Sequence, residues 1–128
     1  MDIKKIQEMI NETNYWDKRI LDIQSNFFGD EINIYIEGND NSCWKLCFAS
    51  CYQVAYETDA DWRGDIEVRD MKKLQLGYYG HTISVLESEL PNFYQVYLQL
   101  SIMSITILCK QIDISKIKRV PLQFFGEQ

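Results

Sequence analysis

The sequence has little of what linkers, repeats and membrane spans require. Its 128 residues include only two prolines and six glycines, and no Pro- or Gly-rich linker, internal repeat or low-complexity tract divides them. The longest apolar-looking stretch, residues 97–109, is interrupted by glutamine, serine and threonine, whereas a membrane-spanning helix needs about 20 apolar residues. The N-terminus also lacks the apolar run of a signal peptide. We therefore predict a single domain over residues 1–128, outside the membrane and cytoplasmic.

Recognisable catalytic motifs are absent as well. The chain has no glycine-rich dinucleotide loop, no phosphate-binding loop and no nucleophile elbow. His81 is the only histidine, which excludes a site with two imidazoles, and no local catalytic signature accompanies any of the four cysteines. We predict no catalytic residue, no metal ligand and no cofactor, and we expect the protein to act by binding.

The cysteine pattern does not predict a zinc site. Cys43, Cys47 and Cys51 recur at intervals of four residues, and Cys109 lies far away in the sequence. Zinc sites typically use paired C-x-x-C motifs, which the chain lacks. In a reducing compartment we favour buried free thiols; a disulfide and a metal site are the alternatives.

The charge is acidic and unevenly distributed. The net charge is −6, and residues 1–70 hold 15 acidic against 7 basic residues, whereas residues 71–128 hold 4 against 6. An acidic surface repels the phosphate backbone, which argues against direct nucleic-acid binding. The charge suits a basic protein partner instead.

Hydrophobic periodicity predicts one helix and then strands. Ile3, Ile6 and Ile10 recur at three- and four-residue spacing, which predicts an amphipathic helix that ends in residues 11–14. From residue 20 the period changes to two. Residues 20–28 and 32–36 flank a Gly-Asp turn, the pattern of a β-hairpin.

Further strands are expected at residues 44–58, 78–86, 93–100 and 102–112, with a turn at residues 38–42. Residues 59–73 are ambiguous between a loop with a short strand and a helical turn, and residues 115–119 suggest irregular structure or an edge strand. Strands and helices do not alternate as a parallel sheet would require. We predict an α+β, mainly β fold, with the N-terminal helix packed on a curled antiparallel sheet or sandwich of six or seven strands.

The segment that follows the strand at 44–58 is the most suggestive local pattern. Six acids fall within fourteen residues, against Arg63 and Arg69. Residues 59–70 partly match a calcium-binding loop, with acids at positions 1, 3, 7 and 9 and glycine at position 6. However, Arg63 occupies a ligand position and Asp70 replaces the usual glutamate. A solvated loop and a surface for a basic partner are the other interpretations.

Neighbouring aromatic residues favour the partner interpretation. Trp and Tyr are enriched in binding hot spots, and acids around them would speed encounter with a basic protein. Aromatics in strands are more often core than interface, which applies to Tyr52 and Tyr56, so Trp62 is the better candidate for an anchor. The predicted partner-binding residues are Tyr56, Glu57, Asp59, Asp61, Trp62, Asp65, Glu67 and Asp70.

Two stretches resemble small bacterial immunity proteins of polymorphic-toxin and contact-dependent inhibition systems. They are WKLCFASCYQVAYET, residues 44–58, and GYYGHTISVLESELPNFYQVYLQLSIMSITILCKQI, residues 77–112. The likeness is one of pattern and includes a Trp-led strand, a CYQV strand followed by acids, and a late hairpin that ends in Cys-Lys. It implies a cytoplasmic, acidic, non-catalytic protein that binds and neutralises a cognate toxin.

Two other functions remain open from the sequence. Closed antiparallel sheets can enclose a small apolar ligand, so a β-barrel or sandwich that binds such a ligand is one alternative. The aromatic residues, 13% of the chain, also suit a structural subunit of a homo-oligomer.

Overall fold

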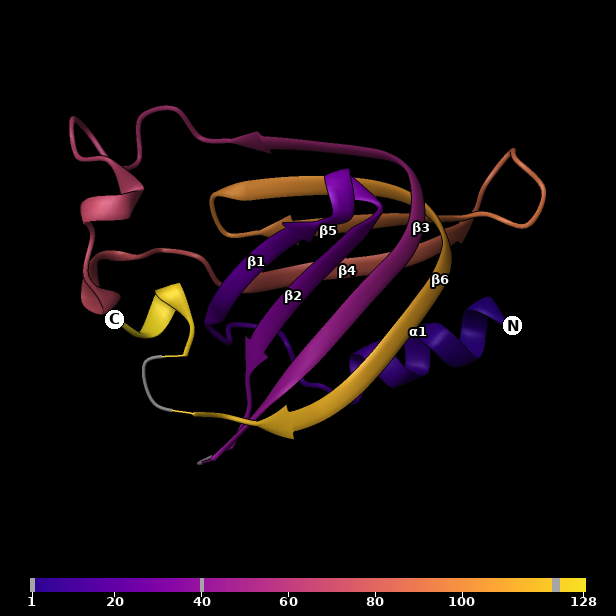
Figure 1. The fold of residues 1–128 in the computed structure, drawn as a ribbon, viewed down its shortest axis with the longest axis horizontal. Coiled ribbons are helices and arrows are strands. Elements are labelled where there is room, and N and C mark those ends of the chain that lie inside the picture. Colours follow the sequence, from indigo (N-terminus) through magenta and orange to yellow (C-terminus); the bar gives the residue numbers. More distant parts are fainter. Residues whose placement is uncertain (1, 40, 121–122) are drawn as a thin grey trace.

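The computed structural model describes residues 2–39, 41–120 and 123–128 and shows an N-terminal helix followed by six strands (Figure 1). The turn predicted at residues 38–42 therefore includes Asp40, which lies outside the described residues. The elements are α1 Ile3–Asn11, β1 Ile20–Asn26, β2 Glu31–Glu37, β3 Ser42–Thr58, β4 Gly80–Glu87, β5 Tyr94–Leu100 and β6 Met103–Lys118. Four short 3-10 helices lie between and after them: η1 Phe27–Gly29, η2 Val68–Asp70, η3 Lys73–Gln75 and η4 Phe125–Glu127.

Helix α1 forms where the apolar spacing predicts it. The Asp2 side chain caps its N-terminus by accepting a hydrogen bond from the Lys4 backbone N–H at 3.0 Å. Ile6 and Ile10, four residues apart, are completely buried, so they lie on one face of the helix. That face packs on the sheet, mainly against β4.

All neighbouring strands are antiparallel, in the order β1-β2-β3-β6-β5-β4. The prediction of an N-terminal helix on a curled antiparallel sheet is confirmed, and the six strands belong to one sheet that does not close. One part of the prediction was wrong: residues 115–118 continue β6, where they pair with residues 42–45 of β3 at the centre of the sheet. The hydrophobic run at 102–112 did not indicate this extension, because four of the six residues at 113–118 are polar or charged.

The two central strands bend, and the bend folds the sheet over its core. β3 has a bulge between Cys51 and Gln53, next to Ser50 with a φ of 53°. Before the bulge β3 pairs with β2 and β6, whereas after it β3 pairs with β6 alone. The main core is one cluster that draws buried side chains from α1 and all six strands. Bulges increase local bending, so this one separates β3 into an inner and an outer half.

Residues 15–20 also join the first strand to the fourth. The Ile20 N–H donates to the Tyr78 carbonyl and the Gly80 N–H donates to the Lys18 carbonyl, both at 2.9 Å. Isolated bridges link Trp16 with Gly80 and Arg19 with Tyr79. This seam, residues 15–20 against 78–80, holds the two ends of the curled sheet together.

The C-terminal tail covers the opposite face of the first strands. Phe124 is buried with Leu21, Tyr35 and Cys43, and its ring lies 4.5 Å from that of Tyr35, centroid to centroid. The tail thus supplies a second, smaller hydrophobic cluster.

The remaining sequence predictions concern residues 59–73, the thiols and the membrane. Residues 59–67 form a loop, and the helical turn expected there is η2. All four cysteines are free; Cys43 and Cys109 are buried, whereas Cys47 and Cys51 are half-buried. No helix in the described part of the chain is long and apolar enough to cross a membrane.

Candidate protein-binding site

The acidic segment, residues 57–70, follows the outer end of β3 and lies on the surface. Tyr56 and Glu57 lie just before the end of β3 at Thr58, the next five predicted site residues lie in the loop, and Asp70 ends η2. Trp62 is half-buried and the other predicted residues are exposed, namely Tyr56, Glu57, Asp59, Asp61, Asp65, Glu67 and Asp70. The structure thus places these side chains along one continuous, solvent-facing segment.

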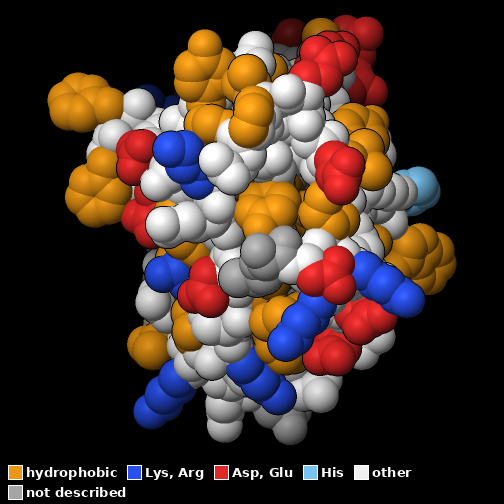
Figure 2. Space-filling view, turned by 90° about the vertical axis from the view of Figure 1, so that its right-hand side faces the viewer, with side chains coloured by type: hydrophobic (Ala, Val, Ile, Leu, Met, Phe, Trp, Pro, Cys, Tyr) orange, Lys and Arg blue, Asp and Glu red, His pale blue; other side chains and the backbone are white. Residues whose placement is uncertain are grey.

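The acids of this segment form no ion pair within the described part of the chain. The ion pairs there join Arg19 and Arg119 to Glu37, and Arg119 to Glu127, near the C-terminal tail. Within the acidic segment, Asp59 accepts a hydrogen bond from the backbone N–H of Asp61 at 2.9 Å. Acidic side chains gather at the upper edge of Figure 2, the height at which β3 ends in Figure 1. The negative charge of the acidic segment is therefore available to a partner.

Trp62 has a structural contact of its own. Its ring meets that of Tyr78 edge to face, with centroids 5.4 Å apart, and it also lies beside Gly77. Burial raises the pKa of the Tyr78 hydroxyl, an effect that nearby Arg63 opposes. Trp62 therefore packs the acidic loop against residues 77–78, just before β4, in addition to any role in binding.

The two tyrosines of outer β3 do not belong to the core, although strand aromatics usually do. Tyr52 and Tyr56 are 71% and 72% exposed. Tyr52 meets the ring of Phe93 edge to face at 5.8 Å, and Lys110 lies over Phe93 at 5.3 Å from the ring centroid. Tyr56 thus has the exposure that an anchor at an interface requires.

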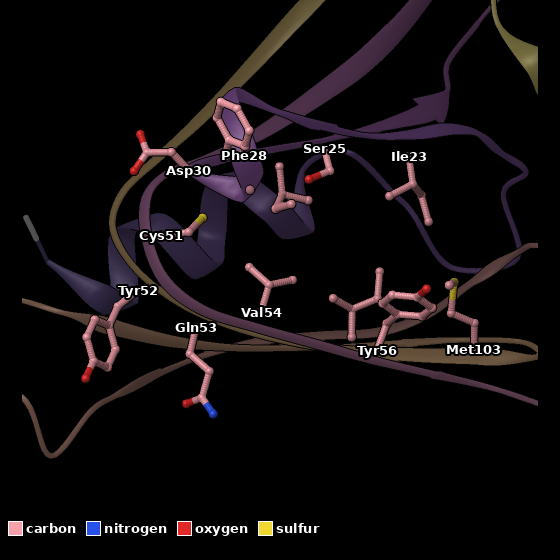
Figure 3. A pocket seen from close by; sticks show the side chains of 13 residues that line it. Ile23, Ser25, Phe28, Asp30, Cys51, Tyr52, Gln53, Val54, Tyr56 and Met103 are labelled. Atoms are coloured by element: carbon pink, nitrogen blue, oxygen red, sulfur yellow. The ribbon is translucent and has the colours of Figure 1, made fainter.

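Beside Tyr56 lies a groove that sequence reasoning missed. It has a volume of about 660 Å³ and opens to solvent between the tip of the β1–β2 hairpin and outer β3 (Figure 3). Ile23 and Ile32 line it on the hairpin side, and Val54 and Tyr56 line it on the β3 side. These residues share the core-facing side of the sheet, since Val54 and Tyr56 pair with Ile107 and Ile105 of the core. The groove is therefore an open extension of the hydrophobic core.

Phe27 and Phe28, at the tip of the β1–β2 hairpin, are the second missed feature. Both have a positive φ, 55° and 59°, which is rare for a bulky residue. Their side chains are exposed, that of Phe28 completely, and Phe28 lines the groove (Figure 3). The signal was present: two aromatics directly before a Gly-Asp turn cannot both face the core, because successive strand residues face opposite sides.

The structure provides no support for a metal site or a reactive thiol near the groove. No group of three or more potential metal-ligating side chains occurs among the described residues, including the loop compared with calcium sites. Cys51 lines the groove, and burial raises the pKa of its thiol. Burial and a hydrogen bond to Glu31 raise the pKa of Cys47 to about 12. These thiols are therefore protonated at neutral pH and poor nucleophiles.

Comparisons with known proteins agree with this architecture. The fold is similar to that of an uncharacterised protein from Neisseria gonorrhoeae in a crystal structure, with a TM-score of 0.52, 12% identity, and coverage of 79% of this chain and 92% of that one. No curated protein matches the sequence. The model of the family "Immunity protein PIM7" matches residues 2–116, from the cap of α1 into β6. The chain belongs to the PIM7 family of immunity proteins.

Proposed function

We propose that this chain binds a cognate bacterial toxin of basic charge and neutralises it by protein–protein contact, without catalysis. Membership of an immunity protein family implies a toxin as partner. The acidic segment is the best-supported place for this contact, because its exposed carboxylates have no ion pair within the described residues. Tyr56, Asp59, Asp61 and their neighbours would contact the toxin there.

The electrostatics of the acidic segment support this assignment. Because these carboxylates form no ion pair within the described residues, pairing them with lysine or arginine breaks no existing ion pair there. A concentrated negative field also raises the association rate with a basic protein. Tyr56, exposed beside these acids, adds apolar contact area of the kind found in hot spots.

The test is a triple charge reversal, Asp59→Lys with Asp61→Lys and Asp65→Lys. Its affinity would be measured by calorimetry against the toxin domain encoded beside this chain's gene, together with protection of cells that express that toxin. We expect at least tenfold weaker binding and loss of protection. The midpoint of thermal unfolding should change little, because these side chains are exposed and form no ion pair with another described residue.

The control is a second triple reversal that changes the net charge equally, at Glu8, Glu12 and Glu89, which are exposed on or near α1 and between β4 and β5. It should retain most of the affinity. Unchanged binding by the first variant would refute the acidic segment as the interface. Equal losses in both would show that net charge alone matters, which would also refute it.

A further inference from the structure

The outer half of β3 presents an unpaired strand edge. β2 pairs with residues 43–49 of β3 and stops there, whereas β6 continues beside β3 to Thr58. Beyond Ala49, the contact on the β2 side within the described backbone is one hydrogen bond, from the Cys51 N–H to the Asp30 carbonyl at 3.0 Å. Residues 50–58, roughly 30 Å of strand at about 3.3 Å per residue, therefore have one open side (Figure 1).

The register identifies which backbone groups face that side. The Asp59 N–H donates to the Ile102 carbonyl across the β3–β6 pair at 2.9 Å, and the register from Thr58 back to Gln53 is regular. Hydrogen-bonded and non-hydrogen-bonded pairs alternate along an antiparallel ladder. Residues 53, 55 and 57 thus direct their N–H and C=O groups toward β6. Val54, Tyr56 and Thr58 direct theirs to the open side.

The edge of the sheet formed by β4, in contrast, is covered. β4 is a terminal strand of the sheet, but α1 and the segment after it cover its backbone. The Gln7 amide accepts from the Val85 N–H and donates to the Ile83 carbonyl, both at 2.8 Å, and the Tyr15 hydroxyl accepts from the Ile83 N–H at 3.2 Å. Natural proteins normally cover or charge their edges in this way to prevent unwanted pairing.

Outer β3 instead carries the side chains of a binding edge. Val54 and Tyr56 are 37% and 72% exposed and point into the groove (Figure 3). A strand laid along the open edge would place alternate side chains over the same groove, because neighbouring strands share their faces. Ile23 and Phe28 form the other wall, so these side chains would enter an apolar slot rather than water.

The charges around the open edge indicate which side chains an added strand would carry. Asp30 is the one charged residue among the described residues that line the groove, and it is exposed. Glu57 lies near the other end of the edge, and Asp59 and Asp61 follow it. An occupant with apolar side chains in its middle and basic side chains toward its ends would match this arrangement.

We propose that the open edge of β3, residues 50–58, receives an extended apolar and basic segment of the toxin as an added β-strand. Main-chain hydrogen bonds to Val54, Tyr56 and Thr58 hold it, and its alternate side chains fill the groove beneath Phe28. Strand addition to an exposed edge is a general mode of peptide recognition. This inference rests on the proposed function and names the structural element by which the toxin is bound.

The test measures amide hydrogen exchange by NMR, with the intact chain free and bound to the toxin domain encoded beside its gene. In the free chain, the amides of Gln53, Ala55 and Glu57 should exchange slowly and those of Val54 and Tyr56 rapidly. In the complex, exchange of Val54 and Tyr56 should slow at least tenfold. Binding without this slowing overturns the added strand and leaves the proposed function standing, whereas absence of binding overturns both.

A matched pair of variants gives a second readout. Val54→Pro removes an N–H on the open side, where proline is tolerated in edge strands, and Val54→Thr keeps that N–H with a side chain of similar shape. We expect at least a hundredfold loss of affinity for Val54→Pro and less than fivefold for Val54→Thr, with folding checked by circular dichroism. Equal affinities overturn the proposal. Slow exchange of Val54 and Tyr56 in the free chain that depends on protein concentration would also overturn it, by assigning the edge to a second copy.

Discussion

Phe27 and Phe28 are the residues at which local preference and structure disagree most. A left-handed backbone costs an ordinary L-residue about 1–2 kcal/mol, and both residues adopt it while their rings lie in solvent. Burial of the two rings within the chain therefore does not offset this backbone strain. Strained conformations of this kind cluster at binding sites, which agrees with the position of Phe28 beside the groove.

Replacement of Phe28 by asparagine should separate stability from binding. Asparagine adopts positive φ more readily than phenylalanine and has no ring to present. We expect the free energy of unfolding to rise by up to about 1 kcal/mol in chemical denaturation, while affinity for the toxin falls at least tenfold. Phe28→Tyr, which keeps the ring, should retain binding. A Phe28→Asn protein that binds as tightly as the native chain would remove Phe28 from the interface.

At the same scale, the sequence identified exposed acids more reliably than exposed aromatic residues. Carboxylates such as Asp61 and Asp65 are costly to bury unpaired, so their exposure followed from chemistry alone. The partition of aromatics did not, because a tyrosine or tryptophan suits both core and surface. Trp62 became half-buried against Tyr78, whereas Tyr56 stayed exposed, and only tertiary packing decides between these outcomes.

Among the elements, the seam between residues 15–20 and 78–80 depends on one glycine. A Cβ on Gly80 would collide with the Tyr15 carbonyl, and Gly80 also exchanges hydrogen bonds with Asp17 and Lys18. No flexible side chain lies in between to move aside. The close approach of two backbones is therefore what requires glycine here.

Gly80→Ala should accordingly destabilise the fold by about 2–3 kcal/mol, since overpacking against the Tyr15 backbone forces the two chain segments apart. Urea denaturation would measure the free energy of unfolding. The control is Gly77→Ala, three residues earlier, where a Cβ would meet Ile102 at an ordinary 3.5 Å. Equal stability of the two variants would contradict a tightly packed seam.

β3 shows how an element can be predicted and its role still missed. Its aromatic and β-branched residues predicted a strand at 44–58, and the structure confirms one at Ser42–Thr58. The bulge between Cys51 and Gln53 and the early end of β2 determine that its outer half is an open edge. Neither the bulge nor the pairing partner is encoded in the local pattern of β3 itself.

At the scale of the whole molecule, an ionic cluster attaches the C-terminal tail to the sheet. Arg119 donates to both carboxylate oxygens of Glu127 and lies 3.6 Å from Glu37. The hydrogen bonds from Arg119 hold the pKa of Glu127 below its ordinary value of 4.5. A depressed folded-state pKa means that the stabilisation is complete above about pH 4.5 and is lost as the pH falls through the folded pKa.

Glu127→Gln should therefore lower the free energy of unfolding by about 1–2 kcal/mol at pH 7, and this difference should shrink as the pH falls toward 3. Guanidinium denaturation at several pH values between 7 and 3 would measure it. Gln123→Glu, also in the tail, serves as a control for changes in net charge there. A difference that stays constant down to pH 3 would show that the Glu127 carboxylate does not contribute through its charge.

The sequence by itself determined the fold class, the helix and strands, the acidic surface and the family likeness, because these depend on local periodicity and on the chemistry of single side chains. The tertiary structure alone decided that β6 is central, that Trp62 packs on Tyr78, and that the core opens into a groove beside residues 50–58. These features depend on which strands pair and where a pairing stops. Such contacts join residues far apart in the chain, and no local pattern specifies them.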